Sequence, residues 1–376
     1  PANFRKPEIA HSSTQAHIFR FVSRANVPSA MRYTPWQVPS AVWPPMNMTR
    51  PLALFWNETM ELGVVTILGG VLLPLALLAA LWRGTYHSRI EWWLHVLAVC
   101  SYLALIAIAG PWLLAPWYLP YGYAILCAVA AGAAWYRAGR CRPQAPRRIK
   151  SGLTAASTLG MTVFCTSMLC WALSGHRPPE GLSIQLSSPL KGGTYYVVNG
   201  GYSLLINPHM KTLARESLSA YRAQSYALDL VRLDSLGRRA DGLWPADVSR
   251  YHIFGVPVYA PCAGVAAQVE NRLPDQTPPE TDPRHPAGNF VRLRCGDADV
   301  VLAHLMQASL TVSPGDRVRI GQMVGRVGNS GLSTEPHLHL HAQSHGPAGD
   351  FLAGEPMPLR VDGRILVRNS RLGGGD

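Results

Sequence analysis

Four long apolar stretches occupy the first half of the chain, at residues 62–82, 93–114, 118–136 and 153–173, and none of them contains Asp, Glu, Lys or Arg. Each has about the 20 residues that a helix needs to cross the roughly 30 Å hydrocarbon layer of a membrane. Buried helices of a soluble protein are a poorer interpretation, because the stretches lack the polar face of a surface helix. The pattern predicts four transmembrane helices in a region at residues 61–175.

The hydrophobic pattern changes in residues 183–376 to short Val, Ile, Leu and Tyr runs separated by Gly, Pro, Asn and Asp. Such runs are typical of a β domain with tight turns. Stretches with helical periodicity are nearly absent. The predicted strands lie at residues 194–201, 226–233, 255–270, 289–295, 300–305 and 336–343. The sequence therefore predicts a multi-domain protein, with four transmembrane α-helices followed by a mostly antiparallel β-sheet domain.

Charge is distributed unevenly between the two halves. Residues 1–182 hold 15 Lys and Arg against 5 Asp and Glu, whereas residues 183–376 hold 19 against 17. The basic excess therefore coincides with the apolar half, which indicates membrane topology and argues against nucleic-acid binding. Six Lys and Arg lie at residues 137–150, between the third and fourth stretches, and such loops are retained in the cytoplasm. We expect the β domain to lie outside the cytoplasm, in the periplasm or the extracellular space of a bacterium.

The first 60 residues do not fit this scheme as well. They would also lie outside, although they contain six Lys and Arg and no apolar segment. The stretch begins without Met and is rich in Pro. We expect residues 1–60 to be disordered or not part of the natural product.

Two of the seven cysteines, Cys262 and Cys295, fall on predicted strands of the β domain. A compartment outside the cytoplasm permits disulfides, so a bridge between them is plausible. A zinc site built on these two residues is a poorer interpretation, because neither belongs to a CxxC pair and the histidines offer better ligands.

The string GNSGLSTEPHLHLHAQ at residues 328–343 is the most informative motif. On a strand, His337, His339 and His341 are spaced by two, so their side chains leave the same face. Three imidazoles on one face are costly unless something uses them, and zinc is their usual partner. The pattern therefore indicates a metal site.

At this point the sequence resembles the lysostaphin-like zinc metallopeptidases, over residues 185–345. The resemblance is carried by four ordered matches: GVPVYAPCAGV at residues 255–265, AHL at 303–305, VSPGDRVRIGQMVGRVGNSG at 312–331 and STEPHLH at 333–339. It implies the family's β fold, of the duplicated hybrid motif type. It also implies Zn²⁺ as cofactor, peptide-bond hydrolysis as reaction and peptidoglycan as substrate.

The resemblance also implies the site residues. In the family, the second His of HxH and an Asp on an early strand bind zinc, here His339 and Asp229. The first His of HxH and the His of AHL flank the reacting carbonyl, here His337 and His304. The family's further ligand, four residues before the Asp, is replaced here by Ser225.

A third ligand must therefore come from elsewhere, since catalytic zinc sites ordinarily have three protein ligands. A branch of the family with QxYAxD at this site has an Asn/His element just upstream, which implies His209 in INPHM. His341 is the competing candidate, ahead of His252 and His285.

The sequence thus predicts a membrane-anchored zinc metalloendopeptidase that acts on peptidoglycan. Two other classes of function remain as alternatives. A degenerate, non-catalytic family member would bind the cell wall or regulate another hydrolase, and the missing HxxxD histidine favours it. A phosphoryl- or biotinyl-carrier module has a similar hairpin pattern, but it lacks the ordered set of Asp, AHL and HxH.

Overall fold

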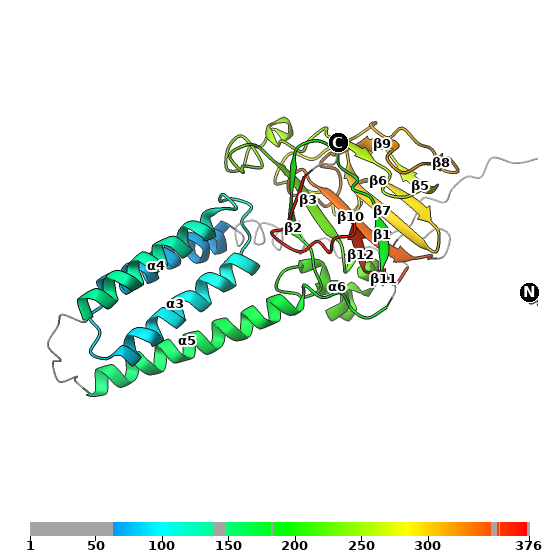
Figure 1. Ribbon diagram of the computed structural model, residues 1–376. Coiled ribbons are helices and arrows are strands. Elements are labelled where there is room, and N and C mark those ends of the chain that lie inside the picture. The colour runs from blue at the N-terminus through cyan, green and yellow to red at the C-terminus, as the bar shows by residue number, and fades with distance from the viewer. Residues whose placement is uncertain (1–62, 139–147, 182, 347–351, 353, 374–376) are drawn as a thin grey trace, which may run out of the picture. The chain divides into compact units, whose positions relative to one another are not determined.

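The computed structural model of the protein describes residues 63–138, 148–181, 183–346, 352 and 354–373 (Figure 1). The predictions for residues 1–60 and for most of the basic loop at residues 139–147 lie outside this range. The described chain consists of four long apolar helical spans followed by an antiparallel β-sheet domain, which confirms the predicted fold class.

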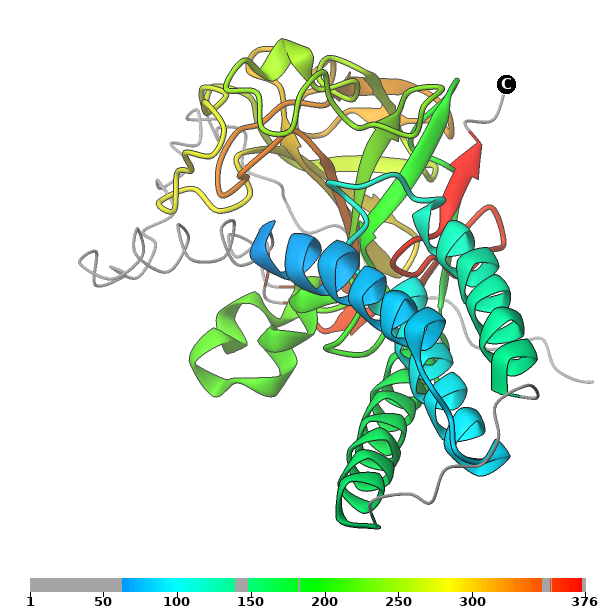
Figure 2. The same cartoon turned by 90° about the vertical axis from the view of Figure 1, so that its left-hand side faces the viewer.

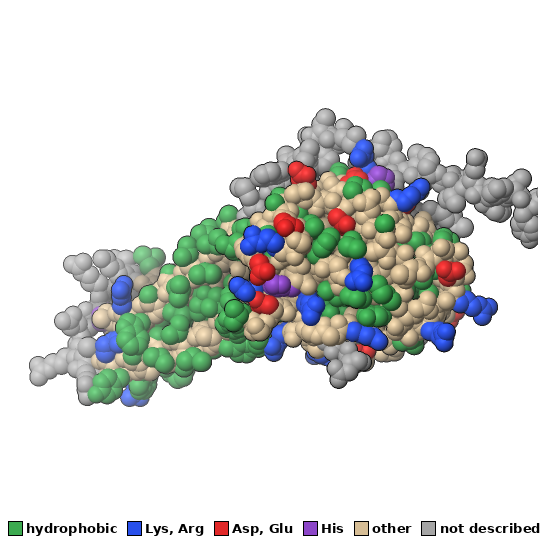
Figure 3. Space-filling model, turned by 90° about the horizontal axis from the view of Figure 1, so that it is seen from above, with side chains coloured by type: hydrophobic (Ala, Val, Ile, Leu, Met, Phe, Trp, Pro, Cys, Tyr) green, Lys and Arg blue, Asp and Glu red, His purple; other side chains and the backbone are tan. Residues whose placement is uncertain are grey.

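Within the described residues, four helical spans are long and apolar enough to cross a membrane, with mean hydropathy between 1.2 and 2.3. They run alongside one another in Figures 1 and 2. Hydrophobic side chains cover their surface in Figure 3, and Ile125 and Phe164 are 67% and 62% exposed. The helical elements are η1 (Val65–Leu72), α2 (Leu73–Arg83), α3 (Arg89–Ala109), α4 (Leu119–Ala138) and α5 (Arg148–Ser174).

Helix α3 begins four residues before the apolar stretch that predicted it. The hydroxyl of Ser88 accepts a hydrogen bond from the backbone N–H of Glu91 at 3.1 Å, and the Glu91 carboxylate accepts one from the backbone of His87 at 2.9 Å. These contacts satisfy amides that a helix start leaves without partners. The helix ends at Ala109 because Gly110 precedes a proline and adopts an extended ψ of 140°.

The first span starts with a π-helical segment, η1. Its glycine carbonyls accept hydrogen bonds from two other helices: Tyr102 of α3 donates to Gly69, and Tyr123 of α4 donates to Gly70 at 2.9 Å. Polar contacts of this kind are needed inside an apolar layer, where no water is present to satisfy the backbone. They bind the first span to α3 and α4.

In the part of the sheet domain that the structure describes, the largest sheet has nine antiparallel strands. Eight of them follow the order β13-β2-β3-β10-β7-β6-β5-β8, and β11 pairs with β10. These strands are β2 (Thr194–Asn199), β3 (Leu228–Leu233), β5 (Gly264–Glu270), β6 (Asn289–Cys295), β7 (Ala298–Leu305), β8 (Arg317–Val318), β10 (Leu338–Ser344), β11 (Pro356–Met357) and β13 (Arg371–Gly373).

Two smaller sheets complete the domain. Strands β4 (Pro257–Tyr259) and β9 (Met323–Arg326) pair antiparallel, whereas β1 (Ile184–Leu186) and β12 (Leu359–Val361) pair parallel. The predicted strand at residues 255–270 is therefore divided between β4 and β5. The core includes the buried Leu338 and Leu340 of β10, so the alternate residues of that strand, among them His339 and His341, point away from it.

Short helices connect β2 to β3, in a part of the domain for which the sequence indicated none. They are η2 (Pro208–Met210), α6 (Lys211–Ala214) and η3 (Glu216–Gln224), and η4 (Val248–Arg250) follows β3. The segment is short and lacks a strong apolar repeat, which explains why periodicity did not reveal it. A disulfide joins Cys262 to Cys295, as the sequence suggested.

Candidate metal centre

The candidate site lies on a row of residues that crosses four neighbouring strands of the large sheet. Asn199 of β2 pairs with Asp229 of β3, Asp229 pairs with His339 of β10, and His339 pairs with Ala303 of β7. Residues paired across antiparallel strands present their side chains to the same face. The strand register therefore places Asn199, Asp229 and His339 side by side.

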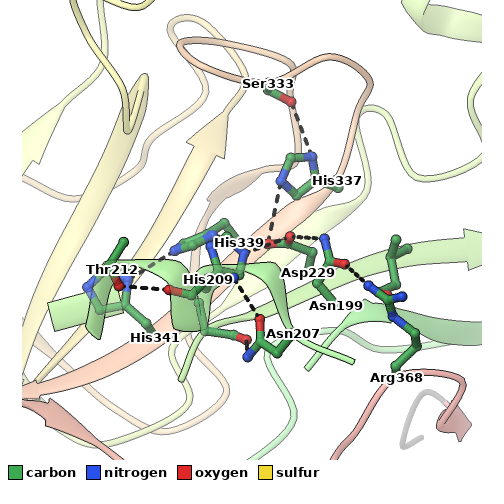
Figure 4. A network of polar contacts seen from close by, with 12 residues as sticks. Asn199, Asn207, His209, Thr212, Asp229, Ser333, His337, His339, His341 and Arg368 are labelled. Carbon is green, nitrogen blue, oxygen red and sulfur yellow. Dashed lines mark hydrogen bonds and ion pairs between the residues drawn. The ribbon is translucent and has the colours of Figure 1, made fainter. Parts of the chain in front are cut away.

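Asp229 is the centre of this arrangement (Figure 4). One carboxylate oxygen, Oδ1, lies 3.0 Å from Nδ1 of His339, and the other, Oδ2, lies 2.9 Å from Nε2 of His209. Nε2 of His337 is 3.6 Å from Oδ1. Asp229 is buried, with 6% of its surface exposed. Three imidazoles thus surround one buried carboxylate.

His209 enters the site from η2, in the connection between β2 and β3. The Asn207 side chain caps η2 by accepting from the backbone of His209 at 3.2 Å, while its amide donates to the carbonyls of Gly201 and Ala227. The carbonyl of His209 accepts from the Thr212 hydroxyl at 2.7 Å. Ser225 contacts Thr212 at 2.6 Å and is fully buried, so the residue at the family's usual ligand position supports the segment that presents His209.

His304 and His337 lie close together, with ring centroids 4.7 Å apart, and the ring of His304 is 5.6 Å from that of His339. Nδ1 of His304 is 2.9 Å from the carbonyl of Ser330, and Nδ1 of His337 is 2.9 Å from the carbonyl of Glu335. A carbonyl only accepts, so each Nδ1 carries a proton, and in the neutral form of either ring Nε2 is the acceptor. His304 has a φ of 60°, a conformation that costs free energy and that recurs at functional sites.

The turn that supports His304 depends on a close approach of two backbones. A Cβ at Gly288 would lie 2.3 Å from the carbonyl oxygen of Ser330, which is the atom that accepts from His304, and Gly288 has a φ of 60°. Only glycine meets both conditions without strain. Gly288 follows the Pro- and Asp-rich segment at residues 272–286 after one residue, and the carbonyl of Pro286 accepts from the backbone of Leu332 in the same turn.

A buried ion pair supports the turn that carries His337. Arg239, whose side chain is 4% exposed, binds both carboxylate oxygens of Glu335 at distances between 2.7 and 3.0 Å. The carbonyl of the same Glu335 accepts from His337. Two-point pairing of this kind restricts the rotation of both groups, so it holds His337 in one orientation.

His341, the competing ligand candidate, lies behind His339 instead of beside Asp229. Its Nδ1 is 3.1 Å from Nε2 of His339, and its Nε2 is 3.3 Å from the side-chain oxygen of Gln343. Since that oxygen only accepts, His341 donates from Nε2 and accepts at Nδ1. His339 therefore donates from Nε2, so in the neutral ring its Nδ1 carries a lone pair that faces the Asp229 carboxylate, as for two ligands of a shared metal ion.

Burial and neighbouring charges perturb this cluster strongly. Burial would raise the pKa of Asp229, but the surrounding imidazoles, foremost His209 and His337, hold it well below its usual range. Burial lowers the pKa of His304 and of His341 well below the ordinary value, and the nearby imidazoles lower them further. Burial also lowers the pKa of His339, against the opposing effect of Asp229. Neutral imidazoles are the form that binds a metal.

Two groups within the described residues could hold a metal ion. One consists of His209, Asp229 and His339, and the other of His304, His337 and His339; in each, the ligand atoms lie within 4.8 Å of one another. The structure thus brings together all five residues singled out in the sequence. His341, His252 and His285 belong to neither group.

The sequence did not point to Asn199 or Arg368, whose side chains continue the network beyond Asp229 in Figure 4. An Asn at the end of a strand and an Arg near the C-terminus carry no distinctive pattern. Their proximity to the site is visible only once the strands are paired.

Comparison with known proteins places part of the sheet domain in a known family. The model of peptidase family M23 matches residues 251–350. A stretch of 116 residues is 32% identical to the peptidoglycan DD-endopeptidase ShyA of Vibrio cholerae serotype O1, and covers 30% of this chain and 24% of that protein. The chain thus spans about a quarter of the length of this curated relative.

Two solved structures are similar at lower identity. A putative M23 peptidase from Pseudomonas aeruginosa is 16% identical, with a TM-score of 0.25. The match covers 58% of this chain and 61% of the Pseudomonas chain. The catalytic domain of lysostaphin from Staphylococcus simulans is 22% identical, covers 30% of this chain and 82% of its own, and has a TM-score of 0.20. The match to the family model, together with the four ordered motifs and the clustered His and Asp side chains, leads to one conclusion: residues 251–350 are a lysostaphin-like domain of peptidase family M23.

Proposed function

We propose that the protein is a membrane-anchored zinc metalloendopeptidase that hydrolyses peptide bonds in bacterial peptidoglycan. The observation that carries the proposal is the convergence of His209, Asp229 and His339 on one small volume, with His304 and His337 beside it. The similarity to a peptidoglycan DD-endopeptidase supports the substrate class.

The donors fit zinc in their chemistry. Two imidazoles and one carboxylate are a usual ligand set for a catalytic zinc ion, which keeps a further position open for water or substrate. His209 takes the role of the ligand that is missing at Ser225. The hydrogen bond from His339 to His341 fixes the orientation of the His339 ring, as outer partners of metal-binding imidazoles commonly do.

A bound zinc ion would supply a Lewis acid that polarises the scissile carbonyl and makes water more acidic. The chain's own residues do the remaining work. His304 and His337 each present an unprotonated Nε2, which can take the proton of the attacking water and return it to the leaving amine. In its protonated form, either ring can donate a hydrogen bond to the oxyanion. Asp229 supplies a negative charge that favours the cation.

The location is part of the proposal. The four apolar spans would anchor the chain in the cytoplasmic membrane, with the basic loop between α4 and α5 inside. The domain at residues 183–376 would then lie outside, where it reaches the cell wall. The helical region at residues 61–175 acts as the anchor in this scheme.

The test is to purify the full chain in detergent, measure its zinc content and incubate it with purified muropeptides. We expect one zinc ion per chain and cleavage of a peptide bond, detected by mass spectrometry. H209A should lose the zinc, whereas the matched variant H252A should keep it. Undiminished zinc in H209A would remove His209 from the ligand set. Full zinc without cleavage of any muropeptide would favour the non-catalytic family member instead.

A further inference from the structure

A line of hydrogen bonds leads from Asp229 away from the metal centre. Nδ2 of Asn199 donates to Oδ2 of Asp229 at 2.8 Å, and Nη2 of Arg368 donates to Oδ1 of Asn199 at 2.8 Å. Figure 4 shows the three side chains in this order. Asn199 lies next to a β-bulge of β2, and Arg368 lies in the loop between β12 and β13. Asn199 and Arg368, which are 169 positions apart in the sequence, thus extend the hydrogen-bond network from the Asp229 carboxylate.

The other end of Arg368 reaches the helical region. Nη1 donates to the carbonyl of Ala109, the last residue of α3, at 3.1 Å, and Nε donates to the carbonyl of Val198 at 3.1 Å. The next residue, Asn369, donates to the carbonyls at positions 107, 108 and 110, at 3.1 to 3.2 Å. The last carbonyls of a helix lack partners within the helix and carry partial negative charge, so a cation is well placed there.

Arg368 determines which way the Asn199 amide faces. An asparagine side chain has one accepting end and one donating end. With Arg368 at Oδ1, the amide must present Nδ2 to Asp229. Without Arg368 the amide is free to rotate, and Oδ1 would then repel the carboxylate. Burial lowers the pKa of Arg368 to about 10, so the side chain is still charged at neutral pH.

We propose that Arg368 is a positioning residue that links the end of α3 to the metal centre, by orienting Asn199 and through it the carboxylate of Asp229. A shift of the last turn of α3 then moves Arg368 and changes how firmly Asp229 holds a metal ion. The apolar helices thereby act on the peptidase site instead of serving as an anchor alone. This inference rests on the proposed function, because it takes Asp229 as a metal ligand.

The first experiment measures metal affinity in the full-length protein in detergent, by competition with a chelator, together with the visible spectrum of the Co²⁺-loaded protein. N199A and R368M should each weaken metal binding by about 10-fold, the lower end of the range for partners of metal ligands. The double variant should be no weaker than either single one, because both act through the same contact. R319M, an exposed arginine on the sheet domain, is the matched control and should bind like the original protein.

The second experiment disturbs α3 itself. A Cβ at Gly110 would lie 2.3 Å from the carbonyl oxygen of Ile106, so G110A must shift the end of the helix, whereas a Cβ at Gly132 of α4 meets no atom within 4 Å. We expect G110A to alter the Co²⁺ spectrum and weaken metal binding several-fold, and G132A to do neither. In the N199A background, G110A should have no further effect.

Three outcomes distinguish a failure of the proposed link to α3 from a failure of the proposed function. Loss of metal in D229A, together with unchanged affinity in N199A and R368M, overturns the link and leaves the proposed function intact. Full metal binding by D229A overturns the proposed function itself. An equal effect of G110A with and without Asn199 would show that α3 acts on the site by another route, and it also overturns the proposal. Since N199A leaves the contact between Arg368 and α3 in place, it remains a test even where R368M folds poorly.

Discussion

The helical region and the sheet domain handle polar groups in opposite ways. The four spans contain few charged side chains, and polar contacts such as that of Tyr123 with the carbonyl of Gly70 are made to the backbone. The sheet domain instead places three imidazoles around one buried carboxylate, Asp229, and two more against the ring of His339. Burying unpaired polar groups is costly, so such a cluster persists only where each group has a partner.

This difference separates polar contacts that stabilise the protein from polar contacts that serve its chemistry. In the spans, a polar contact between helices contributes to packing and its loss should affect stability alone, except at the end of α3, which Arg368 contacts. In the sheet domain, a polar contact orients a neighbour of the candidate metal centre, and its loss should affect chemistry before stability. Variants that change stability without changing chemistry, or chemistry without changing stability, separate the two roles.

The largest effect is expected for His304, which tests the chemical role of the sheet domain. H304A removes an unprotonated Nε2 beside His339 while the set of His209, Asp229 and His339 stays complete. We expect turnover of muropeptides to fall by about 100-fold or more, as for the loss of one group that stabilises a transition state. Zinc content should not change. Normal turnover in H304A would contradict the assignment.

A fall in pH should have an intermediate effect on the stability of the metal-free full chain. His304 and His341 are buried with pKa values well below 6.5, so they stay neutral in the folded state. Unfolding exposes them, and they then bind protons below about pH 6.5. Stability is therefore complete above that pH and is lost as the pH falls, by about 1.4 kcal/mol per pH unit for each imidazole. Asp229, whose pKa in the folded state lies well below the ordinary 3.8, adds to this loss only near and below that pH.

Thermal unfolding, followed by near-ultraviolet circular dichroism between about pH 7.5 and 5.5, measures this dependence. In H341N one of the two imidazoles is absent, so the slope should be smaller. An equal slope in H341N would show that His341 does not contribute.

The smallest effect is expected in the helical region. Y123F removes the hydrogen bond from α4 to the carbonyl of Gly70. The expected loss of stability is about 0.6 kcal/mol, the average for polar contacts between transmembrane helices. Thermal unfolding in detergent measures it. Zinc content and turnover should stay the same, and a loss of zinc in Y123F would break the division between the two regions.

The sequence by itself determined the parts of the protein that depend on local pattern. The absence of charge over four stretches identified the helices, and alternation of side chains identified most of the strands. The spacing of His337 and His339, with the AHL and GDRV motifs, indicated the family, and the resemblance implied all five candidate site residues, His209 among them. Local pattern suffices there because helix and strand periodicity is a property of neighbouring residues.

Only the tertiary structure decided which of these residues meet. His339 and Asp229 are 110 positions apart and face each other because of the register between β10 and β3. His209 reaches the site through short helices that periodicity did not reveal. Arg368 and Asn199 are separated by 169 positions and meet between the sheet and the end of α3. Contacts of this range depend on the pairing of whole strands and helices, which the local pattern does not determine.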